Sequence, residues 1–232
     1  MLVPPFDDGG GGVLQPRTSN LMAKALRPVF QYDRLPELQA ASEWIAGVDE
    51  VGRGALFGPV VAAAVMLPRS ALQPLMLAGV RDSKQLSHKR RQNLAAQIRG
   101  AAIEVQIGYA TVREIDEMNI LQASLRAMQR SILKLKSKPH LCMIDGRTPI
   151  PDLQIPQQNL VGGDRLSLMI AAASIVAKVW RDDWVMRWAH KYPQYDLIAN
   201  KGYGTQRHCL ALQEYGPSPQ HRLSFRPCQP QA

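Results

Sequence analysis

The chain has 232 residues, of which 46% are hydrophobic and 20% charged, the composition of a folded globular protein rather than a disordered or fibrous one. Basic residues exceed acidic ones by nine, and no uncharged apolar run approaches the about 18 residues that a membrane-spanning helix needs. Three cysteines (Cys142, Cys209 and Cys228) lack the spacing of a zinc site, so we expect reduced thiols in a cytoplasmic protein without a disulfide scaffold.

The chain divides into two parts of different composition. Residues 1–43 contain four consecutive glycines and five prolines, which predict a flexible N-terminal extension ahead of a main domain at 44–232. In the main domain, the apolar segments Trp44–Val51 and Pro59–Leu67 predict two strands joined by a glycine-rich connection, and Ala101–Ala110 predicts a third. Their short connections indicate an antiparallel meander.

Helical patterns occupy much of the remaining chain, with one more strand between them. Ser87 is expected to cap the first helix and Gly100 to end it. A short apolar run, His140–Ile144, predicts a fourth strand that ends at Asp145. This order predicts an α/β fold whose mixed sheet combines an antiparallel meander with parallel strands and is flanked by helices. The predicted helices cover Lys89–Arg99, Asn119–Lys136, Asp164–Lys191 and Thr205–Tyr215.

Positive charge gathers in two stretches of the main domain. Arg81–Arg99 contains six basic residues against one acid, and no acid interrupts the basic residues between Arg126 and Lys138. Polyanions bind such surfaces because each neutralised phosphate releases condensed counterions. Solvated helix faces carry similar runs, so the charge favours a nucleic-acid partner without specifying any chemistry.

Four carboxylates lie among apolar neighbours. Asp49 and Glu50 interrupt a predicted central strand, Asp145 ends another, and Asp164 begins an alanine-rich helix. Singly, each has an ordinary explanation, such as a helix cap, a turn or a solvent-facing position. Together they can meet at one edge of the sheet, where their mutual repulsion predicts a site for Mg²⁺ or Mn²⁺. Beside a basic surface, such a site suits phosphodiester hydrolysis with two metal ions.

Seven collinear motifs make the sequence similar to a known family. They are GVDEVGRGALFGPVV, DSKQLS, REIDEMNIL, MIDG, GD followed by IAAASIVAKVWRD, KGYGT and GPSPQHRLSF. Over about residues 44–228 they resemble the type 2 ribonucleases H, the bacterial ribonuclease HII group. The resemblance implies an RNase H-like fold and an endonuclease that hydrolyses the RNA strand of RNA–DNA hybrids. It also implies incision on the 5′ side of ribonucleotides embedded in duplex DNA, leaving 3′-hydroxyl and 5′-phosphate ends, as in ribonucleotide excision during DNA replication and repair.

The resemblance also implies roles for individual residues. It makes Asp49, Glu50, Asp145 and Asp164 the catalytic and metal-binding set, the same quartet that the charge pattern indicates.

Further roles concern recognition of the substrate. The resemblance assigns Gly52, Arg53 and Gly54 to the ribose 2′-hydroxyl, which suits glycines that let the backbone approach a ligand and an arginine that can hold a phosphate. It places Tyr203 beneath the sugar at the RNA–DNA step. A tight turn and a core tyrosine are the ordinary alternatives. The remaining matches, expected to contact phosphates, are Lys84, Ser174 and Lys178.

Some positions in the matched motifs depart from the family pattern or are expected to be structural. The departures bear on substrate affinity and metal preference and leave the four carboxylates intact. They are Ala55 in place of the common proline, Arg147 in place of asparagine, Gly162 and Leu166 each in place of lysine, and Asn200 in place of histidine. The residues expected to form structural ion pairs are Arg181, Asp182, His221 and Arg222.

Two other functions fit the same features. One is a related RNase H-like nuclease, of the resolvase or transposase type, that cuts DNA without needing ribose. The other is a basic nucleic-acid-binding protein whose acids are structural. We expect a monomer, since no dimer-interface pattern is evident, and residues 1–43 have no assigned partner.

Overall fold

The computed structural model describes residues 44–81 and 83–229, so the predicted extension at 1–43 lies outside the described residues. One sheet has the strand order β3-β2-β1-β4-β5. The first three strands pair antiparallel as a meander, and the last two join parallel on the other side, which confirms the predicted mixed sheet. The strands are β1 (Ile45–Val51), β2 (Val60–Met66), β3 (Glu104–Ala110), β4 (Leu141–Asp145) and β5 (Gln157–Leu160).

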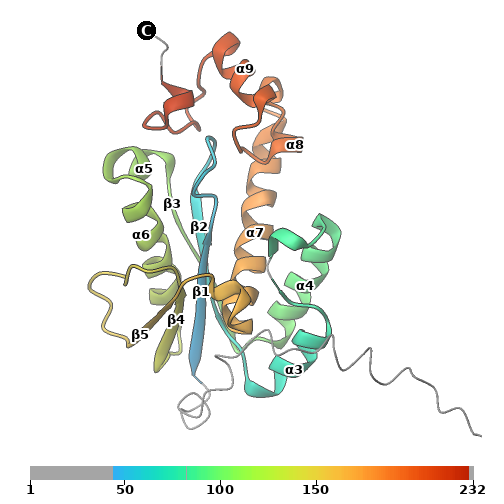
Figure 1. Ribbon diagram of the computed structural model, residues 1–232, viewed down its shortest axis with the longest axis vertical. Helices are drawn as coiled ribbons and strands as arrows, with labels where there is room; N and C mark the ends of the chain where they lie inside the picture. The colour runs from blue at the N-terminus through green and yellow to red at the C-terminus, as the bar shows by residue number, and fades with distance from the viewer. Residues whose placement is uncertain (1–43, 82, 230–232) are drawn as a thin grey trace, which may run out of the picture.

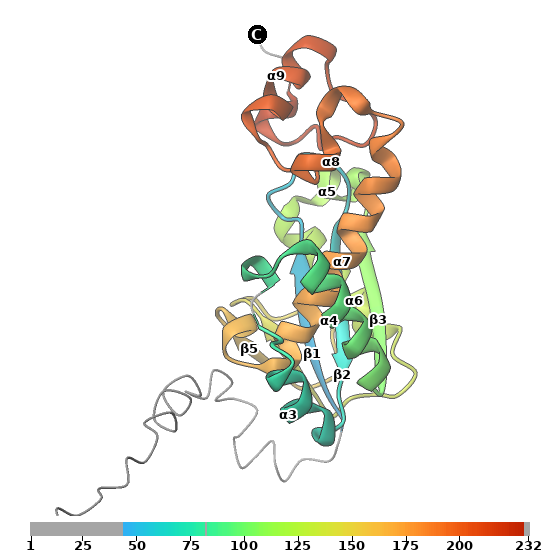
Figure 2. The same cartoon turned by 90° about the vertical axis from the view of Figure 1, so that its right-hand side faces the viewer.

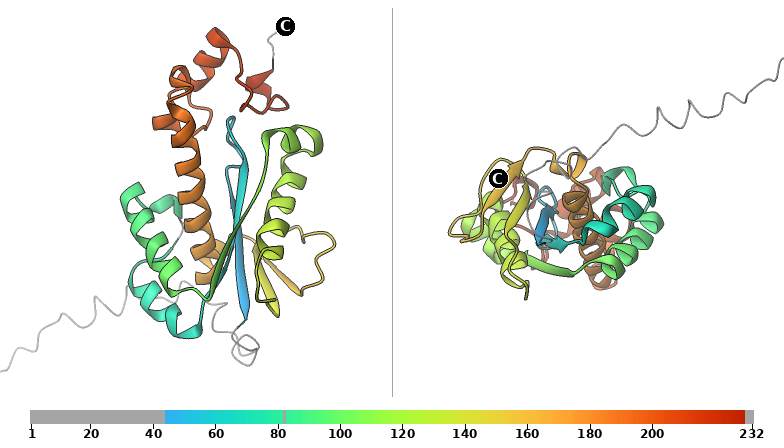
Figure 3. Two further views of the ribbon diagram at one scale, coloured as in Figure 1. Left: turned by 180° about the vertical axis from the view of Figure 1, so that it is seen from behind. Right: turned by 90° about the horizontal axis from the view of Figure 1, so that it is seen from below.

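Helices cover both faces of this sheet (Figures 1 and 3). On one face α7 lies against β1 and β2, with α3 and α4 beside it; on the other face α6 packs on β2 and β3 and is preceded by α5. A lobe containing α8 and α9 extends beyond one end of the sheet (Figure 2). The helices are α3 (Arg69–Leu77), α4 (His88–Ala101), α5 (Val112–Met118), α6 (Ile120–Leu133), α7 (Leu168–Ala189), α8 (Leu197–Asn200) and α9 (Gln206–Tyr215).

Two glycines let the helices approach the sheet closely. A Cβ placed on Gly47 of β1 would lie 2.2 Å from the main-chain carbon of Met169 in α7. A Cβ on Gly108 of β3 would lie 2.1 Å from the carbonyl oxygen of Ala127 in α6. Between them, every residue of β2 is buried, so the central strands have apolar packing on both faces. The contact at Gly47 also fixes α7 beside the strand that carries Asp49.

Several predicted boundaries are wrong in detail. Ser87 does cap α4, accepting a hydrogen bond from the Arg90 amide, but the helix continues through Gly100 to Ala101, so β3 begins three residues later than predicted. The long pattern at 164–191 divides into a short 3-10 turn, η3 (Gly163–Arg165), and α7. No pattern predicted four further helices and strands of the described residues, which are α3, α5, α8 and β5.

The described residues contain free thiols and no membrane-spanning helix. Cys142, Cys209 and Cys228 are free thiols, and burial raises the pKa of Cys142 to about 12, so this thiol is neutral at ordinary pH. Within 44–81 and 83–229, no helix has the length and apolar character required to cross a bilayer.

Candidate active site

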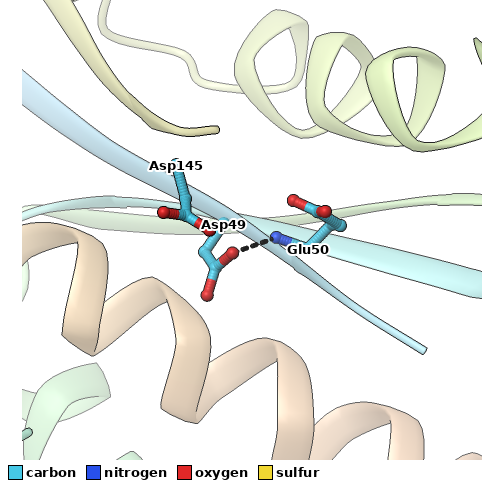
Figure 4. A group of neighbouring side chains, drawn as sticks. All are labelled: Asp49, Glu50 and Asp145. Atoms are coloured by element: carbon cyan, nitrogen blue, oxygen red, sulfur yellow. Dashed lines mark hydrogen bonds between the residues drawn. The ribbon is translucent and has the colours of Figure 1, made fainter. Parts of the chain in front are cut away.

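Three of the four predicted carboxylates meet where β1 and β4 lie side by side. Parallel pairing sets Val48 opposite Ile144, so Asp49 and Asp145 lie level at the ends of neighbouring strands. One oxygen from each of Asp49, Glu50 and Asp145 lies within 4.8 Å of the others. Figure 4 shows this group, with Asp49 extending toward α7 and accepting a hydrogen bond from the Glu50 amide. We call these three residues the acidic centre.

Asp164 lies at the margin of the acidic centre rather than within the group of three. It belongs to η3, where it is buried, and its charge contributes to raising the pKa of Asp49. The neighbouring Gly163 amide donates a 2.7 Å hydrogen bond to Asp145 Oδ1, which attaches η3 to the end of β4. The residue that precedes α7 is Ser167, so Asp164 is not the N-cap of that helix.

Burial and mutual repulsion dominate the electrostatics of the acidic centre. Burial, and then the charges of Glu50, Asp145 and Asp164, raise the pKa of Asp49, while a hydrogen bond from the Ser174 hydroxyl lowers it. The pKa of Glu50 is also raised, mainly by burial, although Arg53 acts in the opposite direction. The side chain of Glu50 is only 8% exposed, which excludes a solvent-facing role.

The acidic centre has the oxygen ligands that a divalent cation requires, and one of these oxygens lacks a hydrogen-bond partner among the described residues. Its side-chain donors are carboxylate oxygens, the ligands that Mg²⁺ and Mn²⁺ prefer. Glu50 Oε2 is buried and has no hydrogen-bond partner among the described residues. A buried carboxylate oxygen without a partner is costly, and a cation would compensate both this oxygen and the repulsion at Asp49. The residues present therefore fit a divalent metal.

A glycine-rich loop continues from β1 beside the acidic centre. Gly52 has φ of +90° and is buried against Arg181, whose Nε would lie 2.2 Å from an added Cβ. Arg53 is exposed and contacts Glu50 Oε1 at 3.1 Å, and Gly54 is exposed with open space around the position of a Cβ, as judged from the described atoms. The loop thus offers backbone groups and one guanidinium to solvent next to the carboxylates.

The segment that carries Tyr203 lies directly against this loop. Ala55 and Tyr203 form an isolated antiparallel bridge, and the Gly202 carbonyl accepts hydrogen bonds from the amides of Leu56 and Phe57. The half-buried Tyr203 ring has Lys178 Nζ and the Arg181 guanidinium each 5.2 Å from its centroid. The two segments predicted to sense the sugar are therefore neighbours, although about 150 residues separate them in the sequence.

The residues predicted to contact phosphates lie around the same site. The Ser83 and Ser174 hydroxyls are 3.0 Å apart, and Ser174 in turn contacts Asp49. Lys84 is exposed in the 3-10 turn η2 (Ser83–Gln85), next to this pair. Lys178 makes a 2.7 Å ion pair with Asp182. These placements are compatible with phosphate contacts, which remain predictions.

The four residues expected to form ion pairs behave differently from one another. Asp182 does pair, with Lys178 and with Arg91 at 3.8 Å. Arg181 and Arg222 are fully buried and, within the described part of the chain, donate to main-chain carbonyls instead of carboxylates. The expectation was wrong for these two, because their guanidinium groups are buried beside main-chain carbonyls of Arg53, Phe57, Gly58 and Pro59, to which they donate. His221 forms a hydrogen bond with His208, a residue outside the seven motifs that carry the family resemblance.

Comparisons with known proteins agree with this geometry. A family model described as ribonuclease HII matches residues 46–228. The ribonuclease HII of Trichormus variabilis is 61% identical over 194 residues, 84% of this chain and 86% of that protein. The crystal structure of ribonuclease H2 from Pyrococcus horikoshii OT3 is similar with a TM-score of 0.69 at 26% identity, covering 79% of this chain and 94% of that one. Bst-RNase HIII, solved in complex with Mn²⁺, shares the fold with a TM-score of 0.65 at 20% identity, covering 82% of this chain and 69% of that one.

Proposed function

Because the chain belongs to the ribonuclease HII family and is therefore a metal-dependent endonuclease, we propose that it cleaves RNA–DNA hybrids and also DNA duplexes that contain single ribonucleotides. Incision falls on the 5′ side of the ribonucleotide and leaves 3′-hydroxyl and 5′-phosphate ends. The observation that carries the proposal is the acidic centre, with Asp49 buried, lying directly beside the loop Gly52–Gly54, in which Arg53 and Gly54 are exposed. This arrangement combines a site for cleaving phosphodiesters with a surface for recognising the sugar.

The acidic centre has a defined part in the proposed reaction. Asp49, Glu50 and Asp145, with Asp164 at the margin, would hold two divalent cations, Mg²⁺ or Mn²⁺. Such cations favour ionisation of an attacking water and stabilise the charge that develops on the leaving oxygen. Ser174 keeps Asp49 oriented through its hydroxyl. These carboxylates have little freedom to move because they lie on paired strands and on a turn that is hydrogen-bonded to β4.

The glycine-rich loop and Tyr203 supply the proposed specificity for ribose. Gly54 is open enough for a sugar to approach its backbone, whose N–H and C=O groups can bond a 2′-hydroxyl. Arg53 holds a phosphate on the outer side of the loop, and Lys84 and Lys178 hold others. The flat ring of Tyr203 lies under the neighbouring deoxyribose. Discrimination against DNA then depends on a hydroxyl that only the ribonucleotide has.

A cleavage assay tests the proposed function. A duplex with one embedded ribonucleotide is incubated with the protein and Mg²⁺, beside an all-DNA duplex of the same sequence and a sample with a chelator. The proposal requires a nick 5′ of the ribonucleotide in the sample with Mg²⁺ and no nick in the sample with the chelator. Equal cutting of the all-DNA duplex would favour a resolvase-type nuclease, and binding without cleavage would favour a nucleic-acid-binding protein.

The wider setting of the enzyme follows from the same features. We propose a cytoplasmic monomer that removes misincorporated ribonucleotides during DNA replication and repair. The free thiols suit a reducing compartment. Light scattering at several protein concentrations gives the oligomeric state, and a mass that rises with concentration would contradict the monomer.

A further inference from the structure

Two buried histidines face each other in the C-terminal lobe, away from the acidic centre. His208 of α9 and His221 have 0% and 1% of their surface exposed, and their Nε2 atoms are 3.0 Å apart. The rings of Phe57 and Tyr195 surround the pair, with centroids 5.1 and 4.6 Å from that of His221. Apolar side chains could fill such a position without the cost of burying polar atoms, so the polar contact itself calls for an explanation.

The outer nitrogen atoms of the pair determine where its protons lie. His208 Nδ1 is 2.9 Å from the Tyr203 carbonyl oxygen, which can only accept, so this nitrogen carries a proton. His221 Nδ1 lies 2.9 Å from both the amide and the hydroxyl of Ser218; because the amide can only donate, this nitrogen is bare. His221 Nε2–H must therefore donate to the bare Nε2 of His208. The result is a directed chain of hydrogen bonds from the Ser218 amide through both rings to the Tyr203 carbonyl.

Both rings of this chain remain neutral at ordinary pH. Burial lowers the pKa of His208, and burial together with His208 lowers the pKa of His221 to about 3. A further proton on His208 Nε2 would place two N–H groups face to face between the rings. A further proton on His221 Nδ1 would point at the N–H of the Ser218 amide. The direction of the chain is therefore fixed under conditions in which the enzyme works.

Both histidine segments are attached to the glycine-rich loop. Tyr203 pairs with Ala55 through the main chain, and His221 pairs with Phe57 in the same way. Next to His221, Arg222 donates through Nη1 to the Arg53 carbonyl at 2.8 Å. The histidine pair thus lies between two segments that each contact the loop, and it links them directly through polar groups.

We propose that His208 and His221 are positioning residues that hold Tyr203 in register with the Gly52–Gly54 loop, so that the enzyme cleaves at single ribonucleotides. This inference rests on the proposed function, because it assumes that Tyr203 supports the sugar next to the ribonucleotide. Neither histidine contacts the substrate. Their effect passes through the Tyr203 carbonyl, and it is largest for a substrate that has an RNA–DNA step.

Matched variants separate positioning from general stability. His208→Asn retains a donor close to the place of Nδ1 and so preserves the bond to Tyr203, whereas His208→Gln places its amide near Nε2 and loses that bond. Each variant loses one of the two hydrogen bonds of the His208 ring: His208→Asn loses the bond to His221, and His208→Gln loses the bond to Tyr203. We expect His208→Gln to lower kcat/KM on the single-ribonucleotide duplex about tenfold, mainly through kcat, because the scissile phosphate is misplaced. Cleavage inside a long hybrid, away from any RNA–DNA step, should change by less than about twofold, and His208→Asn should retain most of the preference.

Controls distinguish failure of this inference from failure of the proposed function. His190→Asn, at an exposed histidine beyond α7, should behave as the parent, and Mn²⁺ binding by calorimetry should be the same in all variants. Equal losses on both substrates, or no loss for His208→Gln, would overturn the positioning role. If the parent protein itself does not nick the single-ribonucleotide duplex, the proposed function fails instead.

A second pair of variants covers the case in which His208→Gln does not fold. His221→Gln retains an N–H near Nε2 that can donate to His208, and His221→Asn does not. The inference predicts that, of these two, only His221→Asn loses part of the preference for single ribonucleotides, by about as much as His208→Asn does, because both break the hydrogen bond between the rings. Equal preference in these two variants would contradict it.

Discussion

At Asp49, burial and the neighbouring carboxylates act in the same direction, since each raises the pKa and disfavours the charged form. Without a bound cation, this carboxylate destabilises the fold at neutral pH. We expect Asp49→Asn to abolish cleavage and, without divalent ions, to raise the free energy of unfolding by about 1 kcal/mol or more. Thermal unfolding with and without Mg²⁺ measures this, and Mg²⁺ should stabilise the parent much more than the variant. A variant less stable than the metal-free parent would show that the acidic centre is not under repulsion.

His221 makes stability depend on pH. Its pKa falls from an ordinary 6.5 to about 3 on folding, so between these values the unfolded chain binds more protons than the native one. The free energy of unfolding therefore carries no penalty from His221 above about pH 6.5, and this penalty grows as the pH decreases, by up to about 1.4 kcal/mol per pH unit. Urea unfolding between about pH 7.5 and 5 should show this slope, and His221→Gln should reduce it. An unchanged slope in the variant would mean that His221 is not the group responsible; the raised pKa of Asp49 acts in the opposite direction in both proteins and cancels in the comparison.

At the scale of elements, two glycines provide a matched test of how α7 packs. Gly47→Ala puts a Cβ into the backbone of α7, so we expect it to cost about 2 kcal/mol or more and to lower activity, because Ser174 moves relative to Asp49. Gly100→Ala lies inside α4, with open space around the position of its Cβ as far as the described residues show. It should stabilise the protein by about 0.5–1 kcal/mol. Chemical unfolding of both variants measures these free energies, and a neutral Gly47→Ala would contradict the close approach of α7 to β1.

The elements that the sequence predicted are those whose local pattern agrees with their environment. β1, β2 and β4 are apolar runs because they lie inside the sheet, and α9 has a capping threonine and a terminal glycine. β5 is polar and, within the described sheet, pairs with β4 alone, so it lacks both an apolar run and a clear alternation. α3 contains a proline, which usually interrupts a helix. Gly100 looked like a helix end, yet exposure lets a helix tolerate it.

The same reasoning explains which parts of the site were predictable. Asp49, Glu50 and Asp145 follow apolar strand residues, and the ends of paired strands must meet, so their proximity could be inferred from the pattern. Asp164 belongs to a turn whose direction depends on packing. The sequence also could not show that His208 faces His221, since only the folding of the lobe brings the two rings together.

At the scale of the whole molecule, two buried arginines join the C-terminal lobe to the sheet. Arg181 of α7 donates to the carbonyls of Phe57, Pro59 and Lys201, and Arg222 donates to those of Arg53 and Gly58. Both therefore hold the loop that follows β1 against the lobe. A buried guanidinium offers five donors in a fixed plane, which suits several carbonyls at once. The proposed sugar-recognition site therefore depends on the contact between the lobe and this loop.

The net charge of nine makes substrate binding depend on salt, because each phosphate contact releases counterions. Binding of the inactive Asp49→Asn variant to a labelled duplex should weaken steeply with added salt. Arg53→Ala should reduce the slope of log affinity against log salt by about one, since it removes the phosphate contact that we propose for this residue. Arg69→Ala is the control, because Arg69 follows the end of β2 that is farther from the acidic centre. This substitution should leave the slope unchanged. Fluorescence anisotropy at several salt concentrations measures both slopes. A slope that is flat in the parent would contradict a phosphate contact at Arg53, and so would a slope that both substitutions reduce equally. In either case the loop beside the carboxylates would not bind the substrate backbone as proposed.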